Sequence, residues 1–149
     1  MREILFHAKR IDNGEWVNGY HVYDYAHNAH FILKNQLVCP NCINDRRIDY
    51  SLCDYEIDPE TLCQFTALND KNGNRIWEND IISINTYDYM EPSEDFFGKV
   101  VYCEAWACWC IQQPDNEKPI PLCECEGNYQ TDRFIEGNIF DNHELLKGE

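Results

Sequence analysis

The sequence predicts a mainly β fold, α+β at most, in which a hairpin-rich N-terminal region precedes a small β-barrel. Apolar and polar residues alternate with a period of two in several short stretches, which is typical of half-buried strands. Clusters of Gly, Asn, Asp and Pro separate these stretches, and strand-like segments outnumber helical ones by about seven to two. The chain has 149 residues, 44% of them hydrophobic, and is therefore long enough to bury a substantial core.

The N-terminal segment has the pattern of a β-hairpin. Residues 3–9 alternate between apolar and polar side chains. Residues 12–14, Asp-Asn-Gly, supply a turn that accepts positive φ, and residues 16–23 begin a second aromatic and β-branched run. A third strand is expected over residues 30–33, and an irregular loop is expected over residues 34–56.

The middle of the chain carries the clearest start and turn signals. Asp58 followed by Pro59 predicts a short helix, because Asp caps free N–H groups and Pro lacks the N–H that the first helical position would leave unbonded. The turn at residues 70–74 leads into a strand over residues 75–84 that bends at Asn79.

Within this bent strand the side chains have distinct expected roles. Asp80 is predicted to accept backbone hydrogen bonds at the bend. Apolar anchors for the core are expected at four positions: Ile76, Trp77, Ile81 and Ile84.

Strands and turns continue to alternate toward the C-terminus. An acidic loop is expected over about residues 85–96. Residues 98–111 are apolar on both alternating faces, which predicts a central strand or a buried hairpin. The remaining expected elements are a turn at 112–118, strands at 120–126 and around 133–136, and a helical turn at 143–147.

Four stretches of the sequence resemble the YopX-like family of small phage and prophage proteins: MREILFHAKRIDNGEWVNGY, DPETLCQFTALNDKNGNRIWENDIISI, GKVVY and EGNIFDNHELL. The resemblance implies a bacterial or phage cytoplasmic protein with a single YopX-like domain over residues 1–149. It also implies an N-terminal β region over about 1–65, an SH3-like barrel over about 66–142 and a tail at 143–149. It implies no established catalytic activity.

Two positions depart from the family pattern, which reads Thr-Gly-Leu and Glu-Gly-Asp. This chain has Ala67 and Asn79 in place of the two glycines. Asn79 can preserve a left-handed bend at modest cost, because Asn tolerates that conformation better than other residues with a side chain. Ala67 tolerates it less well, so its backbone is either not left-handed or strained.

The charge of the chain excludes one class of function. Twelve Lys and Arg against 27 Asp and Glu leave a formal net charge of −15, which would repel a polyanion, so direct nucleic-acid binding is not expected. Residues 76–98 contain six acidic side chains and no basic one. This stretch is either a solvated face or a binding face for a basic protein, and the sequence leaves both interpretations open.

Nine cysteines are expected to be reduced, because the number is odd and the start of the sequence lacks the apolar block of an export signal. His27 and His30, followed by Cys39 and Cys42, have the spacing of a zinc site, although incidental ligands on a surface loop explain them more simply, and a redox CxxC pair is a third interpretation. The pairs Cys108/Cys110 and Cys123/Cys125 lie on expected strands, where core packing and a thiolate cluster are the two interpretations.

No catalytic, cofactor-binding or metal-binding residue is assigned, because the sequence has no GxSxG motif and no Gly-rich phosphate loop. No window approaches the ~20 apolar residues of a membrane span, so a cytoplasmic protein without membrane contact is expected.

The leading hypothesis is a non-enzymatic phage or prophage accessory protein that binds another protein. Its candidate contact residues are Trp77, Trp106 and Trp109, wherever these are exposed. Alternatives are an acidic DNA mimic that inhibits a basic host nucleic-acid-binding protein, and a zinc-stabilised module or redox enzyme built on the cysteines. Homo-oligomerisation also stays open.

Overall fold

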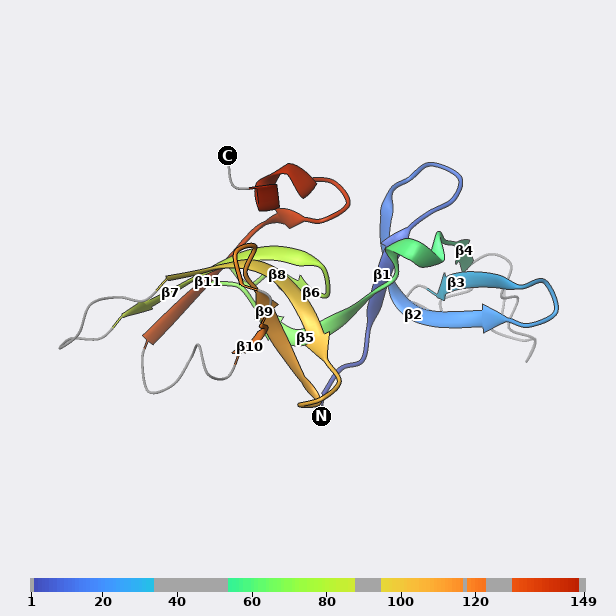
Figure 1. Ribbon diagram of the computed structural model, residues 1–149. Coiled ribbons are helices and arrows are strands. Elements are labelled where there is room, and N and C mark those ends of the chain that lie inside the picture. Colours follow the sequence, from blue (N-terminus) through green and yellow to red (C-terminus); the bar gives the residue numbers. More distant parts are fainter. Residues whose placement is uncertain (1, 34–53, 88–94, 117, 123–129, 148–149) are drawn as a thin grey trace. The chain divides into compact units, whose positions relative to one another are not determined.

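A computed structural model describes residues 2–33, 54–87, 95–116, 118–122 and 130–147 (Figure 1). The described chain forms antiparallel sheets of six and five strands, together with two short 3-10 helices, which confirms the mainly β prediction. The chain divides into two compact units, Met1–Gln64 and Phe65–Glu149. The division falls inside strand β5 (Cys63–Asn69), so each unit is described by itself.

The first unit is built on a meander of short strands. These are β1 (Phe6–Lys9), β2 (Trp16–Asp24), β3 (Ala29–Leu33) and β4 (Asp54–Glu56), and the first residues of β5 pair with β1. The predicted N-terminal hairpin and third strand are confirmed by the β1–β2 and β2–β3 pairing. The expected loop over 34–56 is wrong at its end, because residues 54–56 pair with β3. Residues 34–53 lie outside the described residues.

A small core and a capped helix hold the first unit together. Ala8, Ile32 and Ile57 are fully buried, and Phe6, Val17 and Leu62 pack against them. The predicted helix start is confirmed: Asp58 caps the 3-10 helix η2 (Pro59–Thr61), where its carboxylate accepts the Glu60 N–H at 3.0 Å. The Lys9 N–H donates to the Thr61 hydroxyl at 2.8 Å, which ties this helix to β1.

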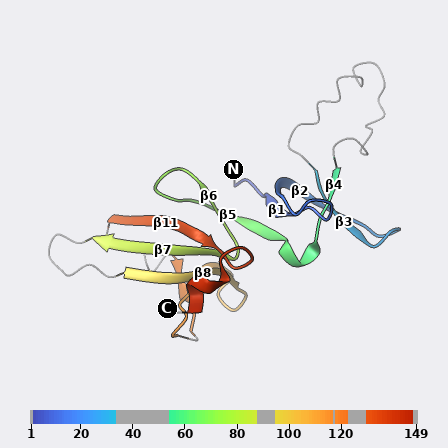
Figure 2. The same ribbon diagram turned by 90° about the horizontal axis from the view of Figure 1, so that it is seen from above.

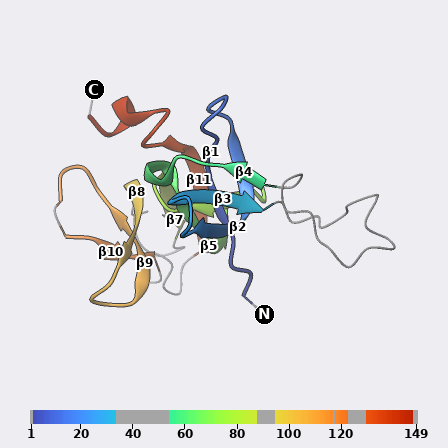
Figure 3. The ribbon, with the colours of Figure 1, turned by 90° about the vertical axis from the view of Figure 1, so that its right-hand side faces the viewer.

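The second unit contains β6 to β11. Their bounds are β6 (Arg75–Trp77), β7 (Asp80–Tyr87), β8 (Asp95–Cys103), β9 (Cys108–Gln112), β10 (Ile120–Pro121) and β11 (Gln130–Asn138), and the 3-10 helix η3 (His143–Lys147) follows. Five of these strands form one sheet in the order β10-β9-β8-β7-β11. Figure 2 shows β11, β7 and β8 side by side, and Figure 3 shows β8, β9 and β10.

The observed strand ends correct one sequence prediction in this unit. The acidic loop expected over about 85–96 is wrong at both ends, because β7 continues to Tyr87 and β8 begins at Asp95, and residues 88–94 lie outside the described residues. Asn85 pairs with Asp95 across β7 and β8, while β11 pairs along β7 as far as Tyr87. Long-range pairing thus extends strands into a segment whose composition favours a loop. The structure also resolves the choice at 98–111 in favour of a hairpin.

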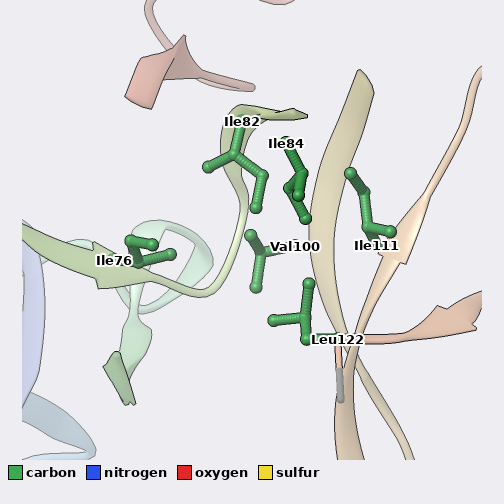
Figure 4. Packing of buried hydrophobic residues seen from close by; sticks show 6 residues of the cluster. All are labelled: Ile76, Ile82, Ile84, Val100, Ile111 and Leu122. Atoms are coloured by element: carbon green, nitrogen blue, oxygen red, sulfur yellow. The ribbon is translucent and has the colours of Figure 1, made fainter. Parts of the chain in front are cut away.

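The core of the second unit lies against this sheet (Figure 4). Its buried members are aliphatic and come from four strands and the residue after β10: Ile76, Ile82, Ile84, Val100, Ile111 and Leu122. Full burial of each such side chain stabilises the fold by roughly 1.5–3 kcal/mol. Ile81 is buried as well, so the anchors predicted at Ile76, Ile81 and Ile84 are confirmed, and Trp77 is 8% exposed.

The predicted bend separates β6 from β7. Asn79 has φ +67°, the left-handed conformation that Asn tolerates. The Asp80 carboxylate accepts the Trp77 N–H at 2.8 Å, as predicted. The Asn79 N–H donates to the Val100 carbonyl at 2.9 Å, which fastens the bend to β8. Burial raises the pKa of Asp80 to about 7, and the hydrogen bond from Trp77 offsets part of this rise.

The turn at residues 70–74 is also confirmed, and one carboxylate organises it. Asp70 Oδ1 accepts the N–H groups of Asn72 at 2.9 Å and Asn74 at 2.8 Å. Desolvation opposes ionisation of Asp70, but these hydrogen bonds outweigh it and lower its pKa. Gly73 takes φ +83° at the point where the chain reverses.

Ala67, which replaces a glycine of the family motif, adopts the left-handed backbone conformation and is therefore strained. Its φ is +67°, and it lies where the β5–β6 register shifts between the pairs Phe65–Trp77 and Asn69–Arg75. The Thr66 hydroxyl stabilises this bulge, since it donates to the Ile76 carbonyl at 2.8 Å and accepts the Leu68 N–H at 3.1 Å. The bulge therefore forms without the glycine that such a position favours.

Replacing Ala67 by glycine is expected to stabilise the protein. Glycine occupies the left-handed region without the steric cost that Ala67 pays, so the free energy of unfolding should rise by roughly 0.5–1 kcal/mol. The measurement is urea denaturation followed by tryptophan fluorescence. Ala105→Gly, at an exposed position without positive φ, is the matched control and should lower stability slightly. Equal effects of the two substitutions would show that Ala67 is not strained.

Within the described residues the five-stranded sheet does not close on itself, because its edges are β10 and β11. In these residues, the barrel expected over about 66–142 is present only as an antiparallel sheet with a buried aliphatic core.

Candidate functional site

The β8–β9 hairpin presents the aromatic side chains that the sequence marked for binding. The two strands pair from Lys99 with Gln112 to Cys103 with Cys108. Residues 104–107 join them, and the Ala107 N–H donates to the Glu104 carbonyl at 3.3 Å to close the turn. Val100 and Ile111 pair across the two strands and are buried in the core, so the strands that carry the loop 104–107 are anchored by packed side chains.

The end of this hairpin, which we call the hairpin tip, consists of Tyr102, Trp106 and Trp109. Tyr102 and Trp109 are paired across the strands, with ring centroids 5.1 Å apart in an edge-to-face arrangement. Trp109 is half-buried and packs against the core. Tyr102 is 49% exposed and Trp106 is 47% exposed. The Lys118 ammonium lies 5.9 Å from the centre of the Trp106 ring, at the range of a cation–π contact.

Trp77 does not belong to an exposed surface. Its side chain is buried, and the centroid of its ring lies 5.4 Å from that of Phe65. Its backbone N–H donates to the Asp80 carboxylate. Of the three tryptophans proposed as contact residues, Trp77 is therefore excluded, whereas Trp106 and Trp109 remain candidates.

In the first unit, the Trp16 ring stacks on the His7 ring, with 4.4 Å between the ring centroids. Burial lowers the pKa of His7 to about 4.

The histidines proposed for zinc take different partners. His27 is exposed and its Nδ1 lies 2.7 Å from Asp24, which lowers the pKa of that carboxyl through a side-chain hydrogen bond. His30 Nδ1 lies 2.9 Å from His21 Nε2, and burial together with the charge of His30 lowers the pKa of His21. Sequence reasoning missed the His21–His30 pair, because it is a diagonal contact between β2 and β3 that only the register reveals.

In the part of the chain that the structure describes, no three or more His, Cys, Asp or Glu side chains are arranged so that they could hold one metal ion. Cys39 and Cys42 lie outside the described residues, so the four-ligand zinc hypothesis stays a prediction. Cys123 and Cys125 also lie outside them.

The Cys108/Cys110 pair lies on β9 with both thiols on one face, as the strand period predicts, and their Sγ atoms are 3.8 Å apart. Cys110 is fully buried and packs as a core residue. Burial, then the neighbouring thiols of Cys108 and Cys103, raises the pKa of Cys110 to about 12. Cys103, directly opposite Cys108 on β8, is a third member of this cluster that the CxC motif did not reveal.

The acidic stretch 76–98 contributes less to the described surface than its composition indicates. Asp80 is buried at the bend and Glu78 is half-buried, whereas Asp95 is exposed. Exposed carboxylates occur in both units, for example Glu15, Glu60 and Glu136. Asp88, Glu91 and Glu94 lie outside the described residues, so whether the stretch forms a binding face stays a prediction.

An open cleft of about 360 Å³ lies beside the hairpin base. It is lined by Phe97, Gln113, Pro114, Asp115, Asn116, Leu145, Leu146 and Lys147. Its lining combines apolar side chains with amides and one charge of each sign, a composition suited to contact with a peptide segment as much as with a small molecule.

The described helices are too short to cross a membrane. A search of the curated proteins found no match. A family model described as "YopX protein" matches residues 6–147. The match spans nearly the whole chain and includes the N-terminal hairpin, the bent strand and the C-terminal segment on which the resemblance rests. We conclude that the chain belongs to the YopX family.

Proposed function

We propose that the protein is a non-enzymatic accessory protein, encoded by a phage or prophage, that binds another protein in the cytoplasm through the hairpin tip. The observation that carries this proposal is the half-exposed Trp106 in a loop whose two strands are anchored in a buried core. Aromatic side chains held in this way concentrate the binding energy of protein interfaces.

The hairpin tip has the amphipathic character of a contact surface. Trp109 fixes the orientation of Tyr102 through an edge-to-face contact, so the exposed ring loses little conformational freedom on binding. Trp106 adds a second large ring beside the Lys118 cation. A partner that suits this surface carries an apolar or aromatic patch that can cover both rings.

The net charge of −15 favours a partner that carries basic side chains around its contact surface. Acidic side chains are exposed in both described units, so the field acts over the molecule as a whole and favours encounter with a positively charged protein. The field is screened within about 8 Å at physiological salt, so it raises the association rate more than the final affinity.

Trp106→Ala is expected to weaken binding by about 30-fold, which corresponds to the roughly 2 kcal/mol of an interface hot spot. The partner is first recovered with the full-length protein from a host lysate, purified, and titrated against each variant by calorimetry. Tyr87→Ala is the matched control, because Tyr87 is 48% exposed in the same unit but lies at the end of β7. Equal affinities of the two variants, or no reproducible partner, would refute the assignment.

The competing function is mimicry of DNA charge by the acidic surface, because the sequence contains 27 acidic side chains and only 12 basic ones. The two functions differ in their dependence on salt. A charge mimic loses affinity steeply between low salt and ~200 mM salt, whereas an aromatic hot spot keeps most of its affinity. A steep salt dependence together with an unchanged Trp106→Ala variant would establish mimicry and overturn binding through the hairpin tip.

We also propose that the five-stranded sheet is the SH3-like part that family membership implies. Gly98 supports this, because a Cβ there would lie 2.2 Å from the Gln112 carbonyl oxygen. A glycine at such a close approach of two strands is typical of the tight bends of small barrels.

A further inference from the structure

Three thiols meet on one face of the β8–β9 hairpin, opposite the face that carries Tyr102 and Trp109. Cys103 and Cys108 form the last pair of the ladder, next to the four-residue loop. Cys110 follows Cys108 by two residues, with 3.8 Å between their Sγ atoms. Directly opposite residues of a ladder point to the same face of the sheet, so the Cys103 side chain lies on the face that carries Cys108 and Cys110.

Backbone geometry selects one pair among the three for covalent linkage. Residues directly opposite in an antiparallel ladder have Cα atoms about 4.5–5.5 Å apart, within the range that disulfides occupy. Residues two apart on one strand are about 6.6–6.8 Å apart, at the upper limit of that range. Cys103 and Cys108 are therefore better placed for a disulfide than Cys108 and Cys110.

Burial also distinguishes Cys103 and Cys108 from Cys110. Cys110 is fully buried, and its thiol stays protonated at neutral pH. Cys103 and Cys108 are only half-buried, at the end of the ladder where a small reagent can approach. Since the thiolate is the reacting species, the two half-buried cysteines are the reactive members of the cluster.

We propose that Cys103 and Cys108 are a redox site that forms a cross-strand disulfide on reaction with a low-molecular-weight disulfide such as glutathione disulfide. The thiolate of one cysteine attacks a sulfur of glutathione disulfide, forms a mixed disulfide and releases one glutathione thiolate. The second cysteine attacks the protein sulfur of the mixed disulfide and releases the second glutathione. Two protein thiols are oxidised, one glutathione disulfide is reduced, and the two protons pass to the released glutathione.

The product would close a covalent ring over residues 103–108, the segment that contains Trp106. The ring fixes both ends of the loop at their present separation, because the two residues already face each other across the ladder. This site depends only on the thiols and the strand register, and not on what the hairpin tip binds.

Glu104 allows a direct test, because a protease that cleaves after Glu separates the two cysteines. Fragment 95–104 then contains Cys103 alone, and fragment 105–117 contains Cys108 and Cys110. The full-length protein is incubated with glutathione disulfide, quenched in acid, alkylated, digested and analysed by mass spectrometry. We expect the two fragments to be joined by a disulfide in the wild type and separate after reduction.

Three variants identify the bond. The joined fragments should persist in Cys110→Ala and disappear in Cys103→Ala and Cys108→Ala. Joined fragments in Cys108→Ala but not in Cys110→Ala would assign the bond to Cys103 and Cys110 and overturn the proposal. Glutathione adducts without any joined fragments in the wild type would also overturn it. Circular dichroism of each reduced variant confirms that it is folded before oxidation.

Discussion

Gly98→Ala is expected to destabilise the second unit by on the order of 3–5 kcal/mol, a large share of the ~5–15 kcal/mol that stabilises a typical domain. A Cβ at this position would lie 2.2 Å from the Gln112 oxygen, 2.6 Å from its carbonyl carbon and 3.0 Å from the Gln113 Cα. All three are backbone atoms, so no side-chain rotation relieves the clash, and β8 and β9 must separate. Urea denaturation followed by tryptophan fluorescence measures the loss.

Gly73→Asn is the control for this substitution. Gly73 lies in the same unit and has φ +83°, but a Cβ there meets no atom within 4 Å, and Asn tolerates the left-handed region. Its stability should fall by no more than about 1 kcal/mol. If Gly98→Ala and Gly73→Asn unfold at the same urea concentration, the close approach of β8 to β9 is not part of the fold.

The second large effect is a dependence of stability on pH that comes from Asp80. Burial raises the pKa of Asp80 in the folded protein to about 7, whereas its carboxyl in the unfolded chain has the ordinary pKa of 3.8. Stability from this group is therefore fully present below about pH 4 and is lost as the pH rises toward 7, because the folded state must then hold a buried carboxylate. The shift corresponds to on the order of 4 kcal/mol by proton linkage.

Asp80→Asn isolates this contribution from that of the other carboxylates. Asn keeps an acceptor for the Trp77 N–H but does not ionise. Relative to the wild type, the variant should therefore gain stability by a few kcal/mol between pH 4 and pH 8. The measurement is the unfolding free energy of both proteins at several pH values. A constant difference across this range would show that Asp80 is not held in a desolvated site.

The parts of the fold that could be predicted from the sequence are those set by local chemistry. The Asp58 cap and the turn at 70–74 follow from residues that bond to their own backbone a few positions away. The bend at Asn79, with its Asp80 acceptor, follows for the same reason. Each of these features needs only neighbours in the sequence, so a single chain suffices to recognise it.

The parts that could not be predicted depend on pairing between distant residues. Strand β4 and the ends of β7 and β8 exist because a neighbouring strand pairs with them, against a composition that favours loops. Register also decides the candidate site, because it places Cys103 opposite Cys108 and His30 diagonally to His21. Burial of Trp77 and exposure of Trp106 follow likewise from the tertiary fold, since Trp77 is buried although its sequence neighbours are mostly polar, and Trp106 is exposed although its neighbours are mostly apolar.

The most direct test of binding through the hairpin tip is site-specific photocrosslinking in host cells. A benzophenone amino acid is placed at position 106 in one variant and at position 87 in another, where Trp106 and Tyr87 have matched exposures of 47% and 48%. We predict a discrete crosslinked adduct with a second protein from position 106 and none from position 87. The same adduct from both positions, or an adduct from position 87 alone, would contradict the proposed function, and so would the absence of any adduct from position 106.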